Sequence, residues 1–361
     1  KQNTLVKKMI ACETIGCINV ICSDKTGTLT ENRMTVTDIY SGSAFFPPEK
    51  LKNDFLAENF CVNSTAEVYF SETGAPRFIG NPTECALLAA AHKSGVEYQA
   101  CRSAAELLYV FPFSSETKNM TSVLKEEGGV RIYTKGSPEK ILSLCSVSGA
   151  EKETAEAAIR DFQCRAGRVL AFAHRDMPEL DNYACRRDEI EREMAFDGFA
   201  VISDPLRSDV PEAVERCRNA GIDLKILTGD NIVTASAIAS ELKLLDDSHI
   251  AAEAGDLEKM SDREFAAALS GIRVIARSTP LVKMRVVNTL KSQGNVVAVT
   301  GDGINDAPAI KNADVGVAMG ITGTEVSKEA SDIVLLDDSF STIVRAVQWG
   351  RGIYENFQRF I

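Results

Sequence analysis

The chain has 361 residues, which is long enough for two domains of ordinary size. Apolar residues make up 45% of it and charged residues 25%, a balance typical of a folded protein, which excludes a disordered tail or a fibrous repeat. The net charge of −11 argues against a nucleic-acid partner, which needs a basic surface. No run of about 18 consecutive apolar residues is present, so no segment is expected to span a bilayer.

Ten cysteines are scattered along the chain without a C-x-x-C pair, and only three histidines are present. Structural zinc sites usually draw on close ligand pairs, and disulfide frameworks belong mainly to small secreted domains. We therefore expect reduced thiols in a cytosolic compartment and no zinc site.

Three short β-rich segments each run into a polar turn that contains glycine: Ile18–Cys22, Leu224–Leu227 and Asn295–Val299. Helical patterns over Asp209–Ala220 and Pro280–Gln293 precede the second and third segments, and each is followed by a glycine, a common helix stop. Strands that alternate with helices predict a parallel sheet with right-handed crossovers. Ligands of such sheets bind outside the carboxyl ends of the strands, where all three turns fall.

A domain-sized insertion is expected between the first two strands, because roughly 200 residues separate them and a crossover needs only a dozen or so. We expect the insertion at residues 37–196, between the two parts of a first domain at 1–36 and 197–361. Mixed strand and helix patterns in it predict an α+β unit with an antiparallel sheet. The strand-like runs are Glu67–Phe70, Leu107–Phe113, Thr121–Leu124, Val130–Thr134 and Val169–His174, and the helical patterns lie around Thr83–His92 and Thr154–Ala166.

Asp24 directly follows the first predicted strand and begins the run DKTGT. A carboxylate at this place can act as a covalent nucleophile on phosphorus and form an aspartyl-phosphate. An isolated D-x-x-G is more often a turn that caps a helix. The neighbouring motifs favour the nucleophile.

Asp302 and Asp306 lie four residues apart in the turn after the third strand. Carboxylates this close to each other and to Asp24 repel strongly, and Mg²⁺ is the oxygen-seeking cation that relieves such repulsion beside phosphate substrates. A solvated acidic loop is the alternative.

Thr228 ends the second strand, and Lys283 lies near the start of the second helical pattern. The threonine can donate a hydrogen bond to a phosphoryl oxygen, and the lysine can neutralise the charge that develops on the group. Taken singly, each is an ordinary strand-end threonine or surface lysine.

Together these residues resemble the haloacid dehalogenase superfamily. DKTGTLT at 24–30 is similar to the phosphorylation motif of P-type cation-transporting ATPases, and TGD at 228–230 and TGDGINDAP at 300–308 match the family's other signatures. The resemblance implies an α/β fold: a Rossmann-like, haloacid-dehalogenase-like parallel sheet as the phosphorylation domain, with an inserted α+β nucleotide-binding domain on an antiparallel sheet. Mg²⁺ would be held by Asp24, Asp302, Asp306 and the Thr26 carbonyl. The catalytic positions it implies are Asp24, Lys25, Thr26, Thr228, Gly229, Asp230, Arg277, Lys283 and Asn305.

Thr26 stands where soluble phosphatases of the superfamily carry a second aspartate for acid–base work. Without that proton shuttle, hydrolysis of the aspartyl-phosphate is expected to be slow. A pump needs this, because the intermediate must survive long enough to drive a conformational change.

The inserted domain would bind ATP, and Phe113 resembles the family's aromatic residue that stacks on adenine. Core packing is the alternative role for Phe113. Ser115 departs from the family, which often has arginine there, and no Walker A sequence is present. The other positions that the resemblance implies for the nucleotide are Glu84, Glu116, Lys118, Lys135, Gly136 and Arg168, with Asp204 and Arg207 at the return from the insertion.

The two ends of the chain, residues 10–16 and 343–361, resemble stalk segments that lead to membrane helices; a terminal amphipathic helix packed on the domain is the alternative for the second. The resemblance implies an integral membrane protein with this part at the cytoplasmic face. The actuator domain, the membrane helices and the transported cation's site would lie elsewhere in the polypeptide.

The function that the resemblance implies is the catalytic part of an ATP-driven cation pump. The run at 323–332 resembles calcium pumps of the plasma-membrane type, with a sodium, potassium or proton pump left open. The alternatives are a soluble aspartate-nucleophile phosphatase of the same superfamily and a nucleotide-binding module without turnover.

Overall fold

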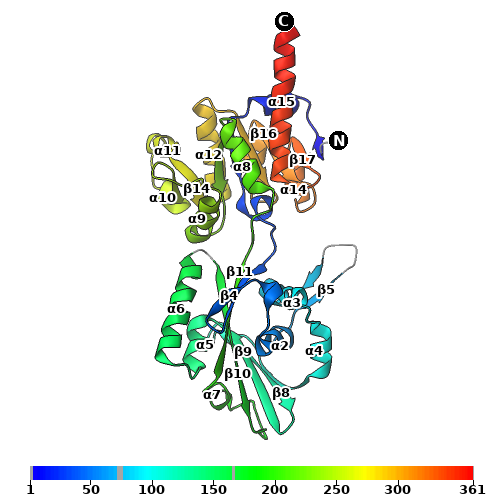
Figure 1. Cartoon of the computed structure of the whole chain (residues 1–361). Helices are drawn as coiled ribbons and strands as arrows, with labels where there is room; N and C mark the ends of the chain where they lie inside the picture. Colours follow the sequence, from blue (N-terminus) through cyan, green and yellow to red (C-terminus); the bar gives the residue numbers. More distant parts are fainter. Residues whose placement is uncertain (1–2, 71–75, 165–166, 361) are drawn as a thin grey trace. The chain divides into compact units, whose positions relative to one another are not determined.

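The computed structural model describes residues 3–70, 76–164 and 167–360. The chain forms two compact units, one made of Lys1–Asn32 with Leu206–Ile361 and the other of Arg33–Pro205 (Figure 1).

The first unit is built on an eight-stranded sheet in the order β1-β17-β16-β15-β2-β12-β14-β13. All neighbours pair in parallel except β1, which pairs antiparallel with β17 at one edge. The predicted parallel sheet is therefore confirmed, with the three motif-bearing strands side by side at its centre. The strands are β1 (Thr4–Val6), β2 (Val20–Ser23), β12 (Asp223–Leu227), β13 (Ile250–Glu253), β14 (Ile272–Ala276), β15 (Val297–Gly301), β16 (Val315–Met319) and β17 (Ile333–Leu335).

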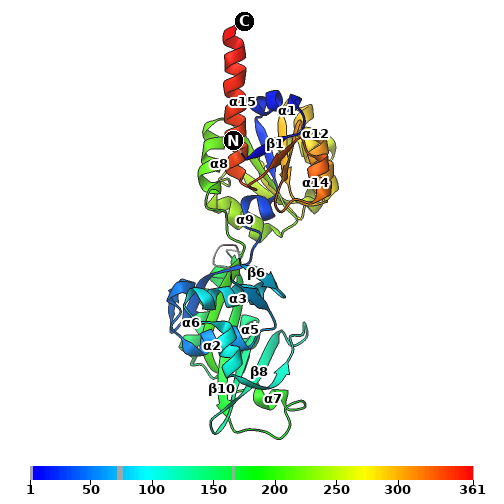
Figure 2. The same cartoon turned by 90° about the vertical axis from the view of Figure 1, so that its right-hand side faces the viewer.

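Helices cover both faces of this sheet, and two apolar clusters lie beneath them (Figure 2). Alternate residues of β2 serve the two clusters: Ile21 packs with α1, α8, α9 and α15, whereas Val20 and Cys22 pack with α10 to α13. Gly221 and Gly294 follow α8 and α12 with φ of 69° and 85°, the left-handed stop that was predicted. The helices are α1 (Ile10–Thr14), α8 (Val210–Asn219), α9 (Ile232–Glu241), α10 (Ala254–Leu257), α11 (Asp262–Ala268), α12 (Pro280–Ser292), α13 (Ala307–Asn312), α14 (Glu325–Ala330) and α15 (Phe340–Phe360), with a 3₁₀ turn η1 (Ile15–Cys17) and a tight turn η2 (Lys25–Leu29).

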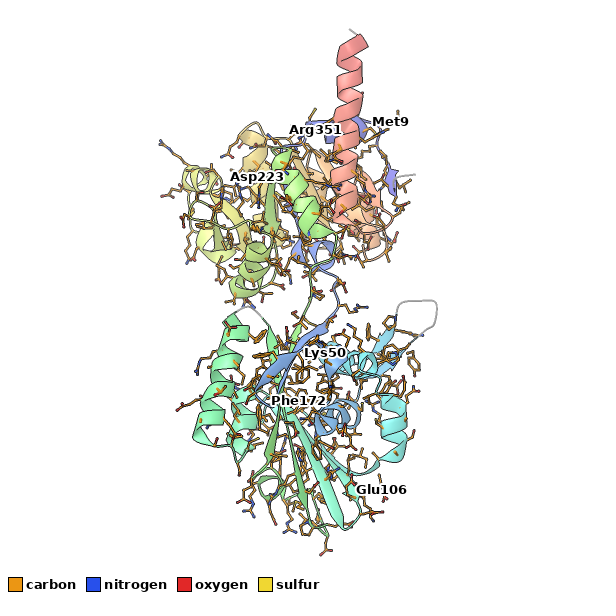
Figure 3. The ribbon with its side chains drawn as sticks, in the orientation of Figure 1. Met9, Lys50, Glu106, Phe172, Asp223 and Arg351 are labelled. Atoms are coloured by element: carbon orange, nitrogen blue, oxygen red, sulfur yellow. The ribbon has the colours of Figure 1, made fainter. Side chains whose placement is uncertain are left out.

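The second unit is built on a seven-stranded, wholly antiparallel sheet in the order β4-β3-β11-β10-β9-β8-β7, as predicted for the insertion. Buried Phe172, labelled in Figure 3, packs on the face covered by α2, α3 and α4, and the other face is covered by α5, α6 and α7. The strands are β3 (Thr35–Ser41), β4 (Ala44–Phe46), β7 (Glu106–Phe111), β8 (Asn119–Glu126), β9 (Gly129–Gly136), β10 (Arg168–Met177) and β11 (Ala195–Ser203), with β5 (Glu67–Tyr69) and β6 (Arg77–Ile79) as a separate hairpin. The helices are α2 (Asp54–Val62), α3 (Pro82–Lys93), α4 (Tyr98–Ala104), α5 (Pro138–Leu144), α6 (Gly149–Cys164) and α7 (Arg187–Ile190), with a 3₁₀ turn η3 (Pro48–Lys50).

The limits of the second unit differ from the expected 37–196, because both expected boundaries fall inside paired strands. β3 and β11 pair with each other, with Thr35 opposite Ser203. Strands joined by a hydrogen-bonded ladder belong to one sheet, so the unit begins before β3 and ends after β11. The expected end of the second helical pattern, Ala166, lies outside the described residues.

The first half of α15 is part of the first unit's core. Phe340, Ile343 and Val347 are buried in it, and Arg351 (Figure 3) donates a 2.9 Å hydrogen bond to the carbonyl of Ala220. Of the helices in the described residues, none is long and apolar enough to cross a membrane.

Candidate functional site

Asp24 lies at the carboxyl end of β2, the strand flanked by β15 and β12. Its backbone N–H donates to the carbonyl of Thr300, at 3.3 Å, and its side chain accepts from the N–H of Lys25, at 2.9 Å. Since the carboxyl ends of parallel strands meet at one edge of a sheet, the turns after β2, β12 and β15 come together there.

Asp24, Asp302 and Asp306 form one acidic cluster, in which one carboxylate oxygen from each lies within 4.8 Å of the others. The Lys283 ammonium lies 2.6 Å from Asp306 and 3.5 Å from Asp24. The Lys283 ammonium therefore pairs with two of the three carboxylates of the cluster.

Lys283 does not fully offset the negative charge of the cluster, as the pKa values of its carboxyl groups show. Burial raises the pKa of Asp24 to about 7, with Lys283 opposing the shift and Asp306 adding to it. Burial, and then Asp306, also raises the pKa of Asp302. Burial alone would lower the pKa of Lys283, but the Asp24 and Asp306 carboxylates raise it by more. A second positive charge would stabilise all three carboxylates.

The donor set fits a divalent cation such as Mg²⁺, which prefers carboxylate oxygens. Gly27 supports this fit, because a Cβ there would lie 2.5 Å from Asp302 Oδ2 and its φ of 77° favours glycine. The turn after Asp24 can therefore approach Asp302 closely. Thr26 lies in this turn, partly buried, and its carbonyl as a ligand remains a prediction.

Buried Lys25 ties this turn to the one after β12 through an ion pair with Asp230. Asp230 N–H donates to the Thr228 hydroxyl at 3.1 Å, and the N–H of Arg277 donates to the Asp230 carbonyl at 2.8 Å. Thr228 is buried beside these groups, whereas Gly229, Arg277 and Asn305 are exposed. Gly229, Arg277 and Asn305 lie in or next to the same turns, so all three are exposed at this edge of the sheet.

Phe113 is 62% exposed, which excludes the core-packing alternative. The turn that follows it is closed by a 2.8 Å hydrogen bond from Lys118 N–H to the Ser114 carbonyl, and Ser137 N–H donates to the Lys118 carbonyl at 3.0 Å. A pocket of about 570 Å³ opens beside this turn. Its lining residues are Glu116, Thr117, Lys118, Ser137, Glu139 and Lys140.

Glu84 and Lys135 form a buried ion pair, with Lys135 Nζ 2.6 Å from Glu84 Oε1 and also bonded to the Asn63 carbonyl. Residues 64–66 add four donors to Glu84 Oε2 at 2.9–3.2 Å. Burial alone would raise the pKa of Glu84, but Lys135 and these donors leave it below its usual value. Burial lowers the pKa of Lys135, with Glu84 opposing.

Gly136 and Arg168 have identifiable structural roles near this pair. A Cβ at Gly136 would lie 2.5 Å from the Lys118 carbonyl oxygen, so glycine lets the end of β9 meet the turn after Phe113. Arg168 donates to the Thr83 hydroxyl at 3.0 Å, one residue before Glu84.

Asp204 and Arg207 fall on different units. Asp204 accepts a 3.1 Å hydrogen bond from Arg33 N–H in the second unit. Arg207 belongs to the first unit and donates to the carbonyls of Thr30 and Gly27, at 3.1 and 3.0 Å. In this structure Arg207 therefore braces the turn after Asp24.

Sequence reasoning missed the Asn63 network. Asn63 donates to the carbonyls of Met120 and Tyr133 at 3.2 Å, accepts from the Ser122 hydroxyl at 2.9 Å, and supplies the carbonyl that Lys135 binds. A polar run, Asn-Ser-Thr at 63–65, directly after the buried helix α2 was the available signal.

Both units have similar sequences among known proteins. Residues 52–209 match the family described as P-type ATPase, cytoplasmic domain N. The whole chain is 41% identical over 382 residues to the calcium-transporting ATPase PAT1 of Dictyostelium discoideum, 38% over 395 residues to a calcium-transporting ATPase of Bacillus subtilis (strain 168), and 39% over 403 residues to the plasma membrane calcium-transporting ATPase 4 of Bos taurus.

Along its whole length the chain is therefore similar to P-type ATPases, and residues 52–209 match their cytoplasmic N domain. Its relatives are calcium-transporting ATPases, among them plasma-membrane types, and it spans 34%, 44% and 33% of the lengths of the three relatives named above.

Proposed function

We propose that this chain is the catalytic part of a calcium-transporting P-type ATPase, in which Asp24 accepts the γ-phosphate of ATP. One observation carries the proposal: Asp24 ends the central strand within 4.8 Å of Asp302 and Asp306, with Lys283 between Asp24 and Asp306. The match of residues 52–209 to the cytoplasmic N domain supports it.

In the proposed reaction, an Asp24 carboxylate oxygen attacks the γ-phosphorus, the bond from phosphorus to the β,γ-bridging oxygen breaks, and ADP leaves. Lys283 neutralises charge on the transferring group, and the Thr228 hydroxyl donates a hydrogen bond to it. Mg²⁺, held by Asp24, Asp302, Asp306 and the Thr26 carbonyl, would screen the phosphate oxygens from the carboxylates. Thr26 supplies no carboxylate to activate water, so the aspartyl-phosphate persists.

The second unit would bind the nucleotide, with adenine stacked on exposed Phe113. Glu116 and Lys118 line the adjacent pocket. Glu84, Lys135, Gly136 and Arg168 would supply further contacts to the nucleotide. An exposed aromatic ring with a polar pocket beside it is a suitable platform for a base. Asp204 and Arg207 would act at the connections between the two units.

The calcium assignment rests on the names of the relatives, because the ion ligands would lie in membrane helices outside this chain. The proposal places this part at the cytoplasmic face of a membrane, with the actuator domain and membrane helices in the same polypeptide.

Incubation with ATP radiolabelled at the γ-phosphate tests the proposal. We expect a label on Asp24 that is stable in acid and released by hydroxylamine, and that is lost in Asp24→Asn and reduced in Asp302→Asn. Phosphate release from simple esters without an accumulated label would favour the phosphatase. Neither label nor release, with ATP bound, would favour a module without turnover.

A further inference from the structure

Asp338 is a buried carboxylate, 2% exposed, in the connection between β17 and α15. Its Oδ1 accepts from the N–H groups of Gly320 and Ile321 at 2.7 and 2.9 Å. Its Oδ2 accepts from the N–H and the hydroxyl of Thr322 at 2.7 and 2.8 Å. One side chain therefore fixes residues 320–322, the start of the loop between β16 and α14.

The other end of this loop contacts the acidic cluster. The N–H of Thr324 donates to the backbone carbonyl of Asp302 at 2.8 Å, and the Ser327 hydroxyl lies 3.1 Å from the same oxygen. Ser327 is fully buried, and Thr324 caps the helix that contains it. Asp302 is thus held from behind by the loop that Asp338 anchors.

Asp338 therefore reaches Asp302 through the hydrogen bonds of one loop.

We propose that Asp338 is a positioning residue for the divalent-cation site: by fixing residues 320–322 it holds Thr324 and Ser327, and through them Asp302, in place. The proposal rests on the proposed function, because it takes Asp302 as a metal ligand. Partners that support a ligand from behind change metal affinity by roughly 10- to 100-fold when removed.

Binding of Mn²⁺, used as a probe ion and followed by electron paramagnetic resonance without nucleotide, tests the proposal. We expect Asp338→Asn to weaken binding about 10-fold, because the amide nitrogen cannot accept the hydrogen bonds that fix residues 320–322. Ser327→Ala leaves the charge in place and removes one contact to Asp302, so we expect a smaller loss. Because both act through one loop, their effects in the double variant should fall short of the sum.

Asp246→Asn is the matched control. The Asp246 carboxylate likewise caps its own loop in the first unit, with all its side-chain hydrogen bonds going to Ser248 and His249. Its substitution should leave Mn²⁺ affinity unchanged. Thermal unfolding of each variant establishes that the measured protein is folded. If Asp338→Asn fails to fold, the Mn²⁺ affinity of Ser327→Ala tests the positioning role instead.

Asp302→Asn separates this inference from the proposed function. If Asp302→Asn weakens binding but Asp338→Asn and Ser327→Ala match the parent, the positioning role is wrong and the metal site stands. If Asp302→Asn leaves binding unchanged, the metal site is wrong and the positioning role with it. Equal losses in Asp246→Asn and Asp338→Asn also overturn the positioning role.

Discussion

The two units treat buried charge in opposite ways. In the first, the Lys283 ammonium pairs with two of three clustered carboxylates, and the pKa values of Asp24 and Asp302 are raised. In the second, Glu84 has one ammonium and four further donors, and its pKa is lowered. The acidic cluster has fewer positive charges than carboxylates, so a bound cation would stabilise it. The Glu84–Lys135 pair already has a counter-charge for each group and needs no further ion.

This difference indicates which kind of ligand each site would bind. The acidic cluster gains stability from any cation that arrives with the substrate. Lys135 bonds to Glu84 and to the Asn63 carbonyl, so a ligand that recruits its ammonium must compete with both. The second unit therefore suits recognition by stacking and shape, which leave the buried pair intact.

The largest expected effect is at the nucleophile. Asp24→Asn should lower phosphoenzyme formation by about 10³-fold or more, because the attacking oxygen is replaced by an amide. Nucleotide binding to the second unit should persist, as measured by calorimetry. Loss of ATP binding in this variant would contradict the separation of the two sites.

Lys283→Met should destabilise the folded chain by about 3–5 kcal/mol, since it leaves buried carboxylates without their cation. Chemical denaturation measures this, and added Mg²⁺ should recover part of the loss. Lys291→Met is the control, because Lys291 lies on the same helix and pairs with Asp314 at 3.2 Å in a partly exposed position. We expect its cost to stay within about 1 kcal/mol. If Lys283→Met and Lys291→Met lower the free energy of unfolding equally, the cluster does not depend on the positive charge of Lys283.

The pair in the second unit should respond asymmetrically. Glu84→Gln leaves a buried ammonium without a counter-charge and should cost about 3 kcal/mol. Lys135→Met leaves Glu84 with four donors and should cost about 1 kcal/mol. The two free energies of unfolding, measured under the same conditions, decide the matter, and the reverse order would refute the account of the pair.

The smallest effect on folding is expected at the exposed ring. Phe113→Ala should change the free energy of unfolding by less than about 0.5 kcal/mol. It should nevertheless weaken ATP binding about 10-fold, because base stacking on an aromatic ring contributes about 1–3 kcal/mol. Tyr69→Ala, at an aromatic ring 48% exposed in the same unit, should leave ATP binding unchanged. Similar ATP affinities in the parent and Phe113→Ala would mean that the Phe113 ring does not contact the bound nucleotide.

The three carboxylates of the cluster could be predicted because each follows a strand of one parallel sheet. Short local patterns placed β2, β12 and β15, and sheet geometry then required their ends to meet. The Glu84–Lys135 pair was predicted as two separate residues. Its joining depends on how α2 and α3 pack on the antiparallel sheet, which local sequence does not specify.

Arg207 shows a second limit of sequence reasoning. Its motif placed it at the return from the insertion, and the sequence did not indicate that its side chain binds two carbonyls of the turn after Asp24. Such contacts join segments far apart in the chain and depend on backbone geometry rather than on residue type. Asp338, whose loop partners lie 16–18 residues away, escaped notice for the same reason.

The connections of the inserted unit have a consequence for how this chain could evolve or be engineered. Thr35 and Ser203 are register partners in the second unit, and Thr30 and Leu206 form a bridge in the first. The chain segments that lead into and out of the second unit are thus paired with each other within each unit. Residues 33–205 could be excised and the cut ends of each unit rejoined through a short turn, so the insertion can grow, shrink or be exchanged without disturbing the sheet that carries Asp24.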